Sequence, residues 1–229
     1  MTADEKELAG FIDHTLLDAT ATSEQIKQVC REAKEYGFCA VSVNPRWVAL
    51  AAEELHGSKV KAGGVVSLPL GADSTKVKAA QAREAVLDGA DEIDMVADLA
   101  SIIEGDERYL SNQLWAVLEV CRSMRPKVVL KVIIESAALT REQKILACEI
   151  ADRCGVDFVK TSTGMNAAGG ATVEDVKLMK EYAPHCRVKA AGGIRTAKQV
   201  LEMLEAGAER IGTSSGVQII EEFKRSRQQ

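Results

Sequence analysis

The stretch TREQKILACEIADRCGVDFVKT (140–161) holds one complete example of the unit from which this chain is built. Thr140 and Gln143 have capping-box spacing, which predicts a helix start because each side chain can bond a free backbone N–H of the other residue. Apolar residues then recur with helical spacing. Gly155 predicts the helix end, since glycine readily adopts the left-handed conformation required there. The run 157–161 that follows is typical of a short buried strand.

Three further copies of this unit are clear along the chain. Each begins at a residue that favours a helix start, continues with an apolar-periodic segment and reaches a glycine just before a short β-rich run. The helical segments begin at Thr22, Asp73 and Thr196. The strands that follow them are Cys39–Val43, Glu92–Val96 and Arg210–Gly212.

Four more strand candidates bring the total to eight. They are Phe11–His14, Val60–Ser67, Val128–Glu135 and Arg187–Ala190, and helices are expected near 23–36, 46–55, 73–88, 107–123, 140–154, 172–182, 196–206 and 216–224. Such alternation predicts an α/β fold of parallel strands with helical crossovers. Eight units in 229 residues favour a single (β/α)8 TIM barrel as one domain, 1–229. An open doubly wound sheet is the alternative, but no G-x-G-x-x-G follows the first strand.

Composition excludes several classes of protein. The net charge of −5 argues against a nucleic-acid surface. The six cysteines form no CxxC pair and the three histidines are scattered, so no metal site is expected. No apolar run approaches the roughly 20 residues that span a bilayer, and the polar start at 1–10 does not resemble a signal peptide. We therefore expect a cytoplasmic protein with no membrane partner.

Ionisable residues interrupt strands that should be apolar. Parallel strands covered by helices normally read as nearly continuous apolar runs. If the apolar neighbours face the helices, Glu92 and Asp94 point into the barrel, as do Lys160 and Lys189 on the sixth and seventh strands. Lys131 on the fifth strand is more simply interpreted as the partner of Glu92 or Asp94. Burying an unpaired charge costs several kcal/mol, so these residues predict a site.

The chemistry follows from the inward lysines. A free lysine is protonated and poorly nucleophilic at neutral pH, whereas desolvation and a nearby ammonium favour the neutral amine. Because Lys189 lies on the next strand and could supply that ammonium, neutral Lys160 could attack an aldehyde and form an imine. The imine is an electron sink, so Asp94 could remove a proton from the adjacent carbon. The product is an enamine, which adds to a second aldehyde.

Glycine-rich loops after the seventh and eighth strands predict a phosphate site. Gly192 and Gly193 follow the seventh strand, and Gly212-Thr213-Ser214-Ser215-Gly216 begins at the eighth. Backbone amides at such loops approach anions closely, and serine hydroxyls add donors. Gly164, after Lys160, could form a third wall. A helix start capped by Ser214 or Ser215 is the other interpretation of the last loop, and it too would bind an anion.

Seven motifs in order resemble the 2-deoxyribose-5-phosphate aldolase family. They are IDHTLL (12–17), VSVNP (41–45), EIDMV (92–96), LKVIIE (130–135), FVKTSTG (158–164), VKAAGGIR (188–195) and RIGTSSG (210–216). The resemblance implies that Lys160 forms the Schiff base, that Lys189 tunes it and that Asp94 transfers protons. It adds Asp13 and Thr161 to the expected substrate-binding residues. The implied reaction is reversible cleavage of 2-deoxyribose 5-phosphate to acetaldehyde and glyceraldehyde 3-phosphate, with no metal or organic cofactor.

Some positions depart from the family pattern. Asp98 and Ala100 stand where an asparagine and a glycine are usual, and Ser42, Met165 and Ala191 also differ from common residues. Two alternatives therefore stay open: a Schiff-base aldolase with a keto-sugar donor, and a phosphosugar-binding barrel without catalysis. A metal-dependent aldolase is disfavoured because ligand clusters are lacking. A homo-oligomer, dimer or tetramer, is expected.

Overall fold

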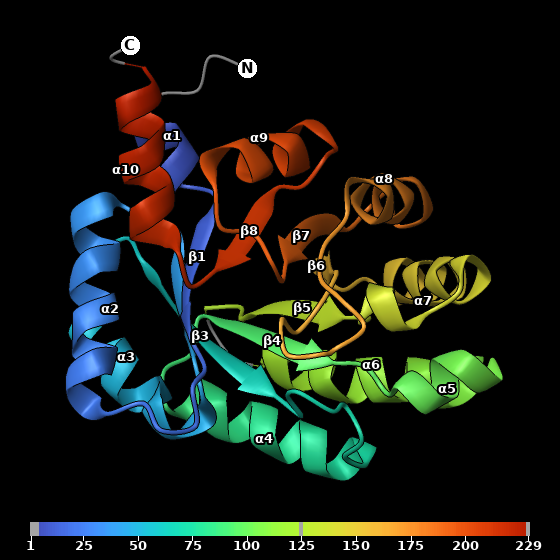
Figure 1. Cartoon of the computed structure of the whole chain (residues 1–229). Coiled ribbons are helices and arrows are strands. Elements are labelled where there is room, and N and C mark those ends of the chain that lie inside the picture. The colour runs from blue at the N-terminus through green and yellow to red at the C-terminus, as the bar shows by residue number, and fades with distance from the viewer. Residues whose placement is uncertain (1–4, 124–125, 228–229) are drawn as a thin grey trace.

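Eight parallel strands close into a barrel in which every strand pairs with its neighbours in sequence, and β8 pairs back with β1 (Figure 1). The computed structural model describes residues 5–123 and 126–227. The ends of the predicted domain, 1–4 and 228–229, lie outside the described residues. The strands are β1 (Ile12–Leu16), β2 (Ala40–Val43), β3 (Lys61–Val66), β4 (Glu92–Val96), β5 (Val129–Ile133), β6 (Phe158–Lys160), β7 (Arg187–Ala191) and β8 (Arg210–Thr213). The chain therefore has the predicted (β/α)8 fold.

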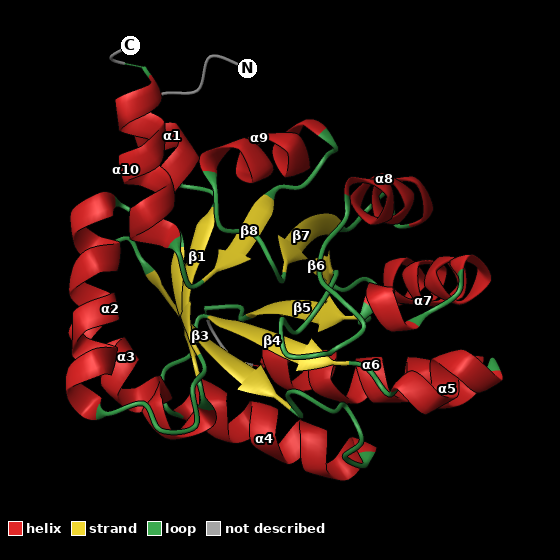
Figure 2. Cartoon of the chain, in the orientation of Figure 1, coloured by secondary structure: helices red, strands yellow, loops and turns green. Residues whose placement is uncertain are grey.

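Helices surround the barrel (Figure 2). The α-helices are α1 (Glu5–Ala9), α2 (Ser23–Tyr36), α3 (Val48–Leu55), α4 (Thr75–Leu87), α5 (Leu99–Glu104), α6 (Glu107–Ser123), α7 (Arg141–Cys154), α8 (Val173–Tyr182), α9 (Ala197–Glu205) and α10 (Gly216–Ser226). Two 3-10 turns, η1 (Pro45–Trp47) and η2 (Ser136–Ala138), follow β2 and β5. Across the described residues, none of these helices has both the length and the apolar character to cross a membrane.

The predicted helix signals have the expected local geometry. Capping boxes are formed at Thr22, Thr140 and Thr196, with reciprocal bonds between the threonine and the glutamine three residues later. Gly37 and Gly155 end α2 and α7 in the left-handed conformation, at φ 74° and 76°. Because caps satisfy backbone groups locally, these boundaries are encoded by sequence alone.

Several expectations about the helices were wrong in detail. The predicted helix at 46–55 consists of the 3-10 turn η1, with Pro45 at its first position, followed by α3. Asp73 does not begin α4: Ser74 occupies the N-cap position without a side-chain capping bond, and the Asp73 carboxylate accepts a bond from Gln81. The short helices α1 and α5 were not predicted, since each is too short for a periodic apolar signal.

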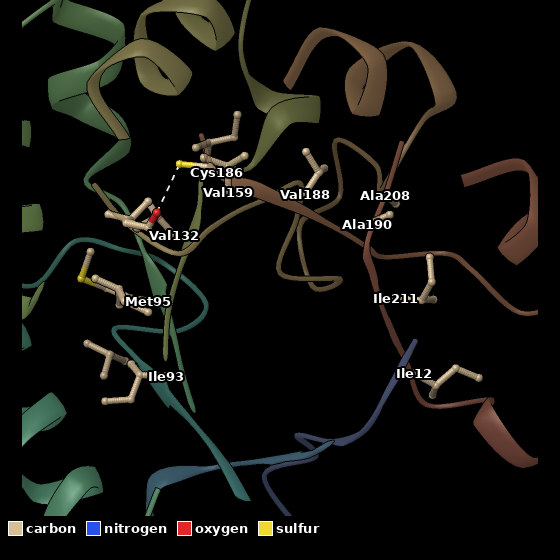
Figure 3. Packing of buried hydrophobic residues seen from close by; sticks show 14 of the residues in the cluster. Ile12, Ile93, Met95, Val132, Val159, Cys186, Val188, Ala190, Ala208 and Ile211 are labelled. Carbon is tan, nitrogen blue, oxygen red and sulfur yellow. Dashed lines mark hydrogen bonds between the residues drawn. The ribbon is translucent and has the colours of Figure 1, made fainter. Parts of the chain in front are cut away.

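An apolar layer fills the space between strands and helices (Figure 3). On β4 it contains Ile93 and Met95, both fully buried. Matching positions on the other strands contribute Ile12, Val132, Val159, Val188, Ala190 and Ile211. Since side chains alternate along a strand, the residues between these positions face the barrel interior. The outer layer therefore fixes which side chains can form an internal site.

Candidate active site

Seven charged side chains from six strands meet inside the barrel. They are Asp13 on β1, Glu92 and Asp94 on β4, Lys131 on β5, Lys160 on β6, Lys189 on β7 and Arg210 on β8, and all are buried. Their convergence follows from the strand register. Lys160 is aligned with Lys189, which is aligned with Arg210, and Asp94 is aligned with Lys131.

Six of these groups form a closed ring of alternating charge, which we call the charge ring. Asp94 accepts hydrogen bonds from Lys131 at 2.8 Å and from Lys189 at 2.7 Å. Lys189 also donates to Asp13, which accepts a second bond from Arg210 at 2.7 Å. Arg210 donates to Glu92 at 2.9 Å, and Glu92 lies 2.6 Å from the Lys131 ammonium. Each carboxylate of the ring thus lies between two cations.

Lys160 is attached to the charge ring as an additional cation. Its Nζ donates to Oδ2 of Asp94 at 2.7 Å, the same oxygen that accepts from Lys189. The ring already balances three cations with three carboxylates, so a protonated Lys160 gives the buried group a net positive charge. Loss of one proton would remove that excess, and Lys160 has the fewest carboxylate partners of the four cations.

Burial and neighbouring charges shift the pKa values of these groups in different directions. Burial would raise the pKa of Asp94, but Lys131, Lys160 and Lys189 hold that pKa well below its ordinary value. Burial would lower the pKa of Lys131, but Asp94, Glu92 and Asp13 raise it. For Lys160 burial dominates and, with the positive charges of Lys189 and Lys131, lowers the pKa to about 8 in spite of Asp94. At neutral pH an appreciable fraction of Lys160 is therefore a free amine.

A cavity of about 450 Å³ opens above Lys160 at the C-terminal ends of the strands. Its walls come from the loops after β1, β6, β7 and β8. The lining residues are Thr15, Leu16, Leu17, Asp18, Lys160, Thr163, Gly164, Met165, Ala191, Gly192, Gly193, Ile194, Arg195, Gly212, Thr213 and Ser214. Active sites of (β/α)8 enzymes are found at this end of the barrel.

Two glycines of the cavity wall are required by close contacts. A Cβ on Gly192, where φ is 92°, would lie 3.0 Å from the Cα of Gly170. A Cβ on Gly212 would lie 3.0 Å from Cε of Lys189. The first glycine lets the loops after β6 and β7 touch, and the second leaves room for the Lys189 side chain in the ring.

The structure brings most of the predicted site residues together. Lys189, Asp94 and Asp13 meet in the charge ring and Lys160 bonds to its Asp94, while Gly164, Gly192, Gly193, Gly212 and Ser214 line the cavity. Thr161 and Ser215 are not among the lining residues. The hydroxyl of Thr161 donates to the Ala191 carbonyl at 3.0 Å, which ties β6 to β7. Ser215 is the N-cap position of α10, and its N–H donates to the Thr213 hydroxyl.

Sequence reasoning missed Arg210 and Glu135. The alternation around Ile211 could have placed Arg210 inside the barrel, but a charge at the first residue of a strand resembles an ordinary exposed end. Glu135 has a left-handed backbone, with φ 53°, and its carboxylate accepts bonds from the N–H and hydroxyl of Thr163. It thereby holds a cavity-lining loop, a role that no sequence pattern indicated.

The departures near Asp98 lie outside the charge ring. The Asp98 carboxylate accepts a bond from the Ser101 N–H and caps α5, in which Ala100 is an internal residue. Ser42 is buried inside β2 and does not line the cavity, whereas Met165 and Ala191 do. None of these changes removes a member of the ring.

Fold and site together define a (β/α)8 barrel with a buried lysine amine beneath a cavity that glycine-rich loops surround. The sequence profile of the DeoC/LacD family aldolases matches residues 8–221. This chain belongs to that family.

Close relatives and solved structures agree with this assignment. A deoxyribose-phosphate aldolase from Thermococcus gammatolerans is 53% identical, over 94% of this chain and 96% of the relative. One from a Geobacillus species is 48% identical, over 95% of this chain and 96% of the relative. The tetrameric deoxyribose phosphate aldolase structure from Aeropyrum pernix superposes with a TM-score of 0.89 at 31% identity, covering 96% of this chain and 92% of the other.

Proposed function

We propose that this protein reversibly cleaves 2-deoxy-D-ribose 5-phosphate to acetaldehyde and D-glyceraldehyde 3-phosphate. The observation that carries the proposal is the Lys160 amine, which lies at the floor of the cavity with its pKa lowered to about 8. The family membership and the names of the relatives support the same reaction.

In the proposed reaction Lys160 is the nucleophile. Its Nζ attacks C1 of the open-chain sugar, water leaves, and an iminium forms. The C2–C3 bond then breaks: its electron pair moves into the iminium to give an enamine, and the C3 hydroxyl loses its proton as it becomes the aldehyde of glyceraldehyde 3-phosphate. Protonation of the enamine at C2 and hydrolysis release acetaldehyde and restore the amine.

Asp94 and Lys189 are proposed to move the protons. Asp94 accepts from both amines at 2.7 Å, so it lies between the nucleophile and Lys189. In this arrangement a proton can pass among the three groups without solvent, and a positioned acid–base pair contributes about 10²- to 10⁴-fold to such steps. Asp13 is assigned to holding Lys189 rather than to direct substrate contact, since its carboxylate lies between Lys189 and Arg210.

The loops after β6, β7 and β8 are proposed to hold the phosphate. Gly164, Gly192, Gly193 and Ser214 line the cavity above Lys160, and Arg195 adds a positive charge at its rim. Backbone amides in glycine-rich loops bind phosphate in this way. Ser215, at the start of α10, is assigned to shaping this loop.

Chemical trapping tests the nucleophile. The protein is incubated with acetaldehyde and sodium borohydride, followed by intact mass and peptide mapping, in parallel with Lys160→Met. We expect one ethyl group on Lys160 and none in the variant. A stronger adduct with dihydroxyacetone than with acetaldehyde would favour a keto-sugar donor. An adduct on Lys131 or Lys189 would contradict the assignment, and phosphosugar binding without any adduct would indicate a non-catalytic barrel.

A glycine substitution tests the phosphate site. Gly192→Ala forces the loops after β6 and β7 apart. We expect KM for 2-deoxyribose 5-phosphate to rise about 10- to 100-fold, the loss of one or two hydrogen bonds to a charged group. Activity on unphosphorylated 2-deoxyribose should change little. Gly105→Ala is the control, because Gly105 has φ 73° and caps α5 away from the cavity. An equal loss with both sugars would contradict the assignment.

We also propose that residues 1–229 form one domain and that the chain assembles into a homo-oligomer in the cytoplasm. The closed barrel spans Ile12 to Thr213, and helices α1 and α10 from the two ends of the chain pack together. Trp115 on α6 and Leu87 on α4 are more than half exposed, which suits a contact with a second copy. Light scattering after gel filtration tests the assembly, and a monomer at micromolar concentration would contradict it.

A further inference from the structure

Three members of the charge ring take no part in the proposed reaction. Glu92, Lys131 and Arg210 are at most 6% exposed. Glu92 and Arg210 are the first residues of β4 and β8 and Lys131 lies in the middle of β5, whereas Lys160 is the last residue of β6. The guanidinium of Arg210 also lies 5.3 Å from the ring centre of Phe158. We call these three residues the charge layer. Such a group of buried charges is costly to maintain, and replacing buried ion pairs by apolar residues is often neutral or stabilising.

The charge layer completes the balance of positive and negative charge around Lys160. Lys131 and Arg210 contribute two positive charges and Glu92 one negative charge, while Asp13, Asp94 and Lys189 supply the rest of the ring. Among the described residues of the strands, Arg187 on β7 is a further charged group near this region: its guanidinium lies 4.0 Å from the same Phe158 ring centre, but the residue is exposed at the start of the strand. Strand β2 has no ionisable residue, and Lys61 on β3 is exposed and lies 3.7 Å from Asp91. The nearby Cys39 thiol has its pKa raised by burial and is neutral.

We propose that Glu92, Lys131 and Arg210 are positioning residues whose balanced charges select Lys160, rather than Lys131 or Lys189, as the amine that gives up its proton and reacts. The inference rests on the proposed function, because it concerns the same nucleophile. With the ring neutral, the surplus positive charge of the site resides on Lys160. Removal of a cation from the layer leaves a surplus of carboxylate that holds the Lys160 proton, and removal of the anion does the reverse.

Two substitutions of opposite charge give the test. The rate of acetaldehyde trapping on Lys160 by sodium cyanoborohydride is measured from pH 5.5 to pH 9.5 for the parent, Arg210→Met and Glu92→Gln. The free amine reacts, so the midpoint of the profile reports its proton affinity. We expect the midpoint to move up by about one pH unit in Arg210→Met and down by about one unit in Glu92→Gln, the scale of a neighbouring buried charge.

Charge-matched variants separate this effect from structural damage. The double variant Arg210→Met/Glu92→Gln changes both charges, so its midpoint should return to that of the parent, and Arg210→Lys should stay close to it. Arg122→Met is the control, because it breaks a partly exposed ion pair with Asp157 outside the ring. It should lower thermal stability without moving the midpoint. If Arg210→Met does not fold, the downward shift in Glu92→Gln still decides the matter.

The outcomes distinguish the two proposals. Shifts of the same sign in the two single variants, or no shift while Lys160 is still trapped, would overturn the role of the charge layer and leave the proposed function standing. Absence of any Lys160 adduct in the parent across the pH range would overturn the proposed function itself. Opposite shifts with recovery in the double variant would establish the charge layer.

Discussion

Two faces of the same strand differ completely in this protein. On β4, Ile93 faces the helices and Asp94 faces the barrel interior, and both are almost fully buried. The environment of Ile93 is a continuous apolar layer. Asp94 has three lysine ammonium groups within 2.8 Å. A shift of one residue along the strand thus exchanges an environment that requires apolar volume for one that requires a balanced charge.

The difference teaches how one fold separates stability from chemistry. The outer layer stabilises the barrel by removing apolar surface from water and by close packing. The attraction between the inner charges at best offsets the free-energy cost of removing them from water. Their arrangement favours the neutral amine of Lys160. Substitutions on the outer face should therefore change stability alone, whereas those on the inner face should change activity and the response to pH.

The largest effect is expected for Asp94→Asn. Three ammonium groups would lose their common carboxylate, so we expect a stability loss of about 3–5 kcal/mol and a fall in kcat of at least about 100-fold. The native pKa of Asp94 is well below its ordinary value of 3.8, so its contribution to stability is fully present above that pH and is lost as pH falls below it. Denaturant unfolding at pH 7 and pH 3.5 should show a smaller loss on acidification in the variant. An equal loss in both proteins would contradict this prediction.

A pH-independent loss is expected for Ile93→Ala. The substitution leaves a cavity in the outer layer and should cost about 2–5 kcal/mol, while Ile93→Val should cost about 0.5–1.5 kcal/mol. The pH profile of kcat should match that of the parent, because no charge changes. Urea unfolding and steady-state kinetics on the same samples test this. A displaced pH profile in either variant would mean that the two faces of β4 are coupled.

The smallest effect is expected for Lys78, a cation on the apolar side. This fully buried lysine of α4 donates to the Val96 carbonyl and to Gln113, each at 2.8 Å, and burial lowers its pKa to about 8. The unfolded state binds the proton more tightly, so this group makes the parent more stable as pH rises from about 8 toward 10.5.

In Lys78→Met the increase in the free energy of unfolding over this pH range should be smaller by about 1 kcal/mol, since the thioether does not titrate. Thermal unfolding between pH 7.5 and pH 10 measures it. Lys160 has a lowered pKa of similar size and contributes with the same sign, so Lys160→Met serves as the comparison and the double variant should show the sum. An unchanged slope in Lys78→Met would mean that Lys78 stays protonated.

The fold could be predicted from the sequence because its signals are local. The capping boxes at Thr22, Thr140 and Thr196 and the glycines that follow each helix mark the repeat without reference to distant residues. Short elements such as α5 escaped prediction because a single turn and a half carries little periodicity. The inward direction of Asp94, Lys160 and Lys189 was also predictable, since alternation along a strand fixes it once the apolar face is known.

The sequence by itself determined the eight strand–helix units, the apolar face of most strands and the inward direction of Glu92, Asp94, Lys160 and Lys189. Only the tertiary structure decided the closed charge ring, because it requires Asp13 and Arg210, 197 residues apart, to meet when β8 pairs with β1. The contact of Gly170 with Gly192 and the hydrogen bond from Thr163 to Glu135 likewise depend on loops that follow different strands. Local patterns encode elements, whereas the proton affinity of Lys160 is a property of charges gathered by barrel closure.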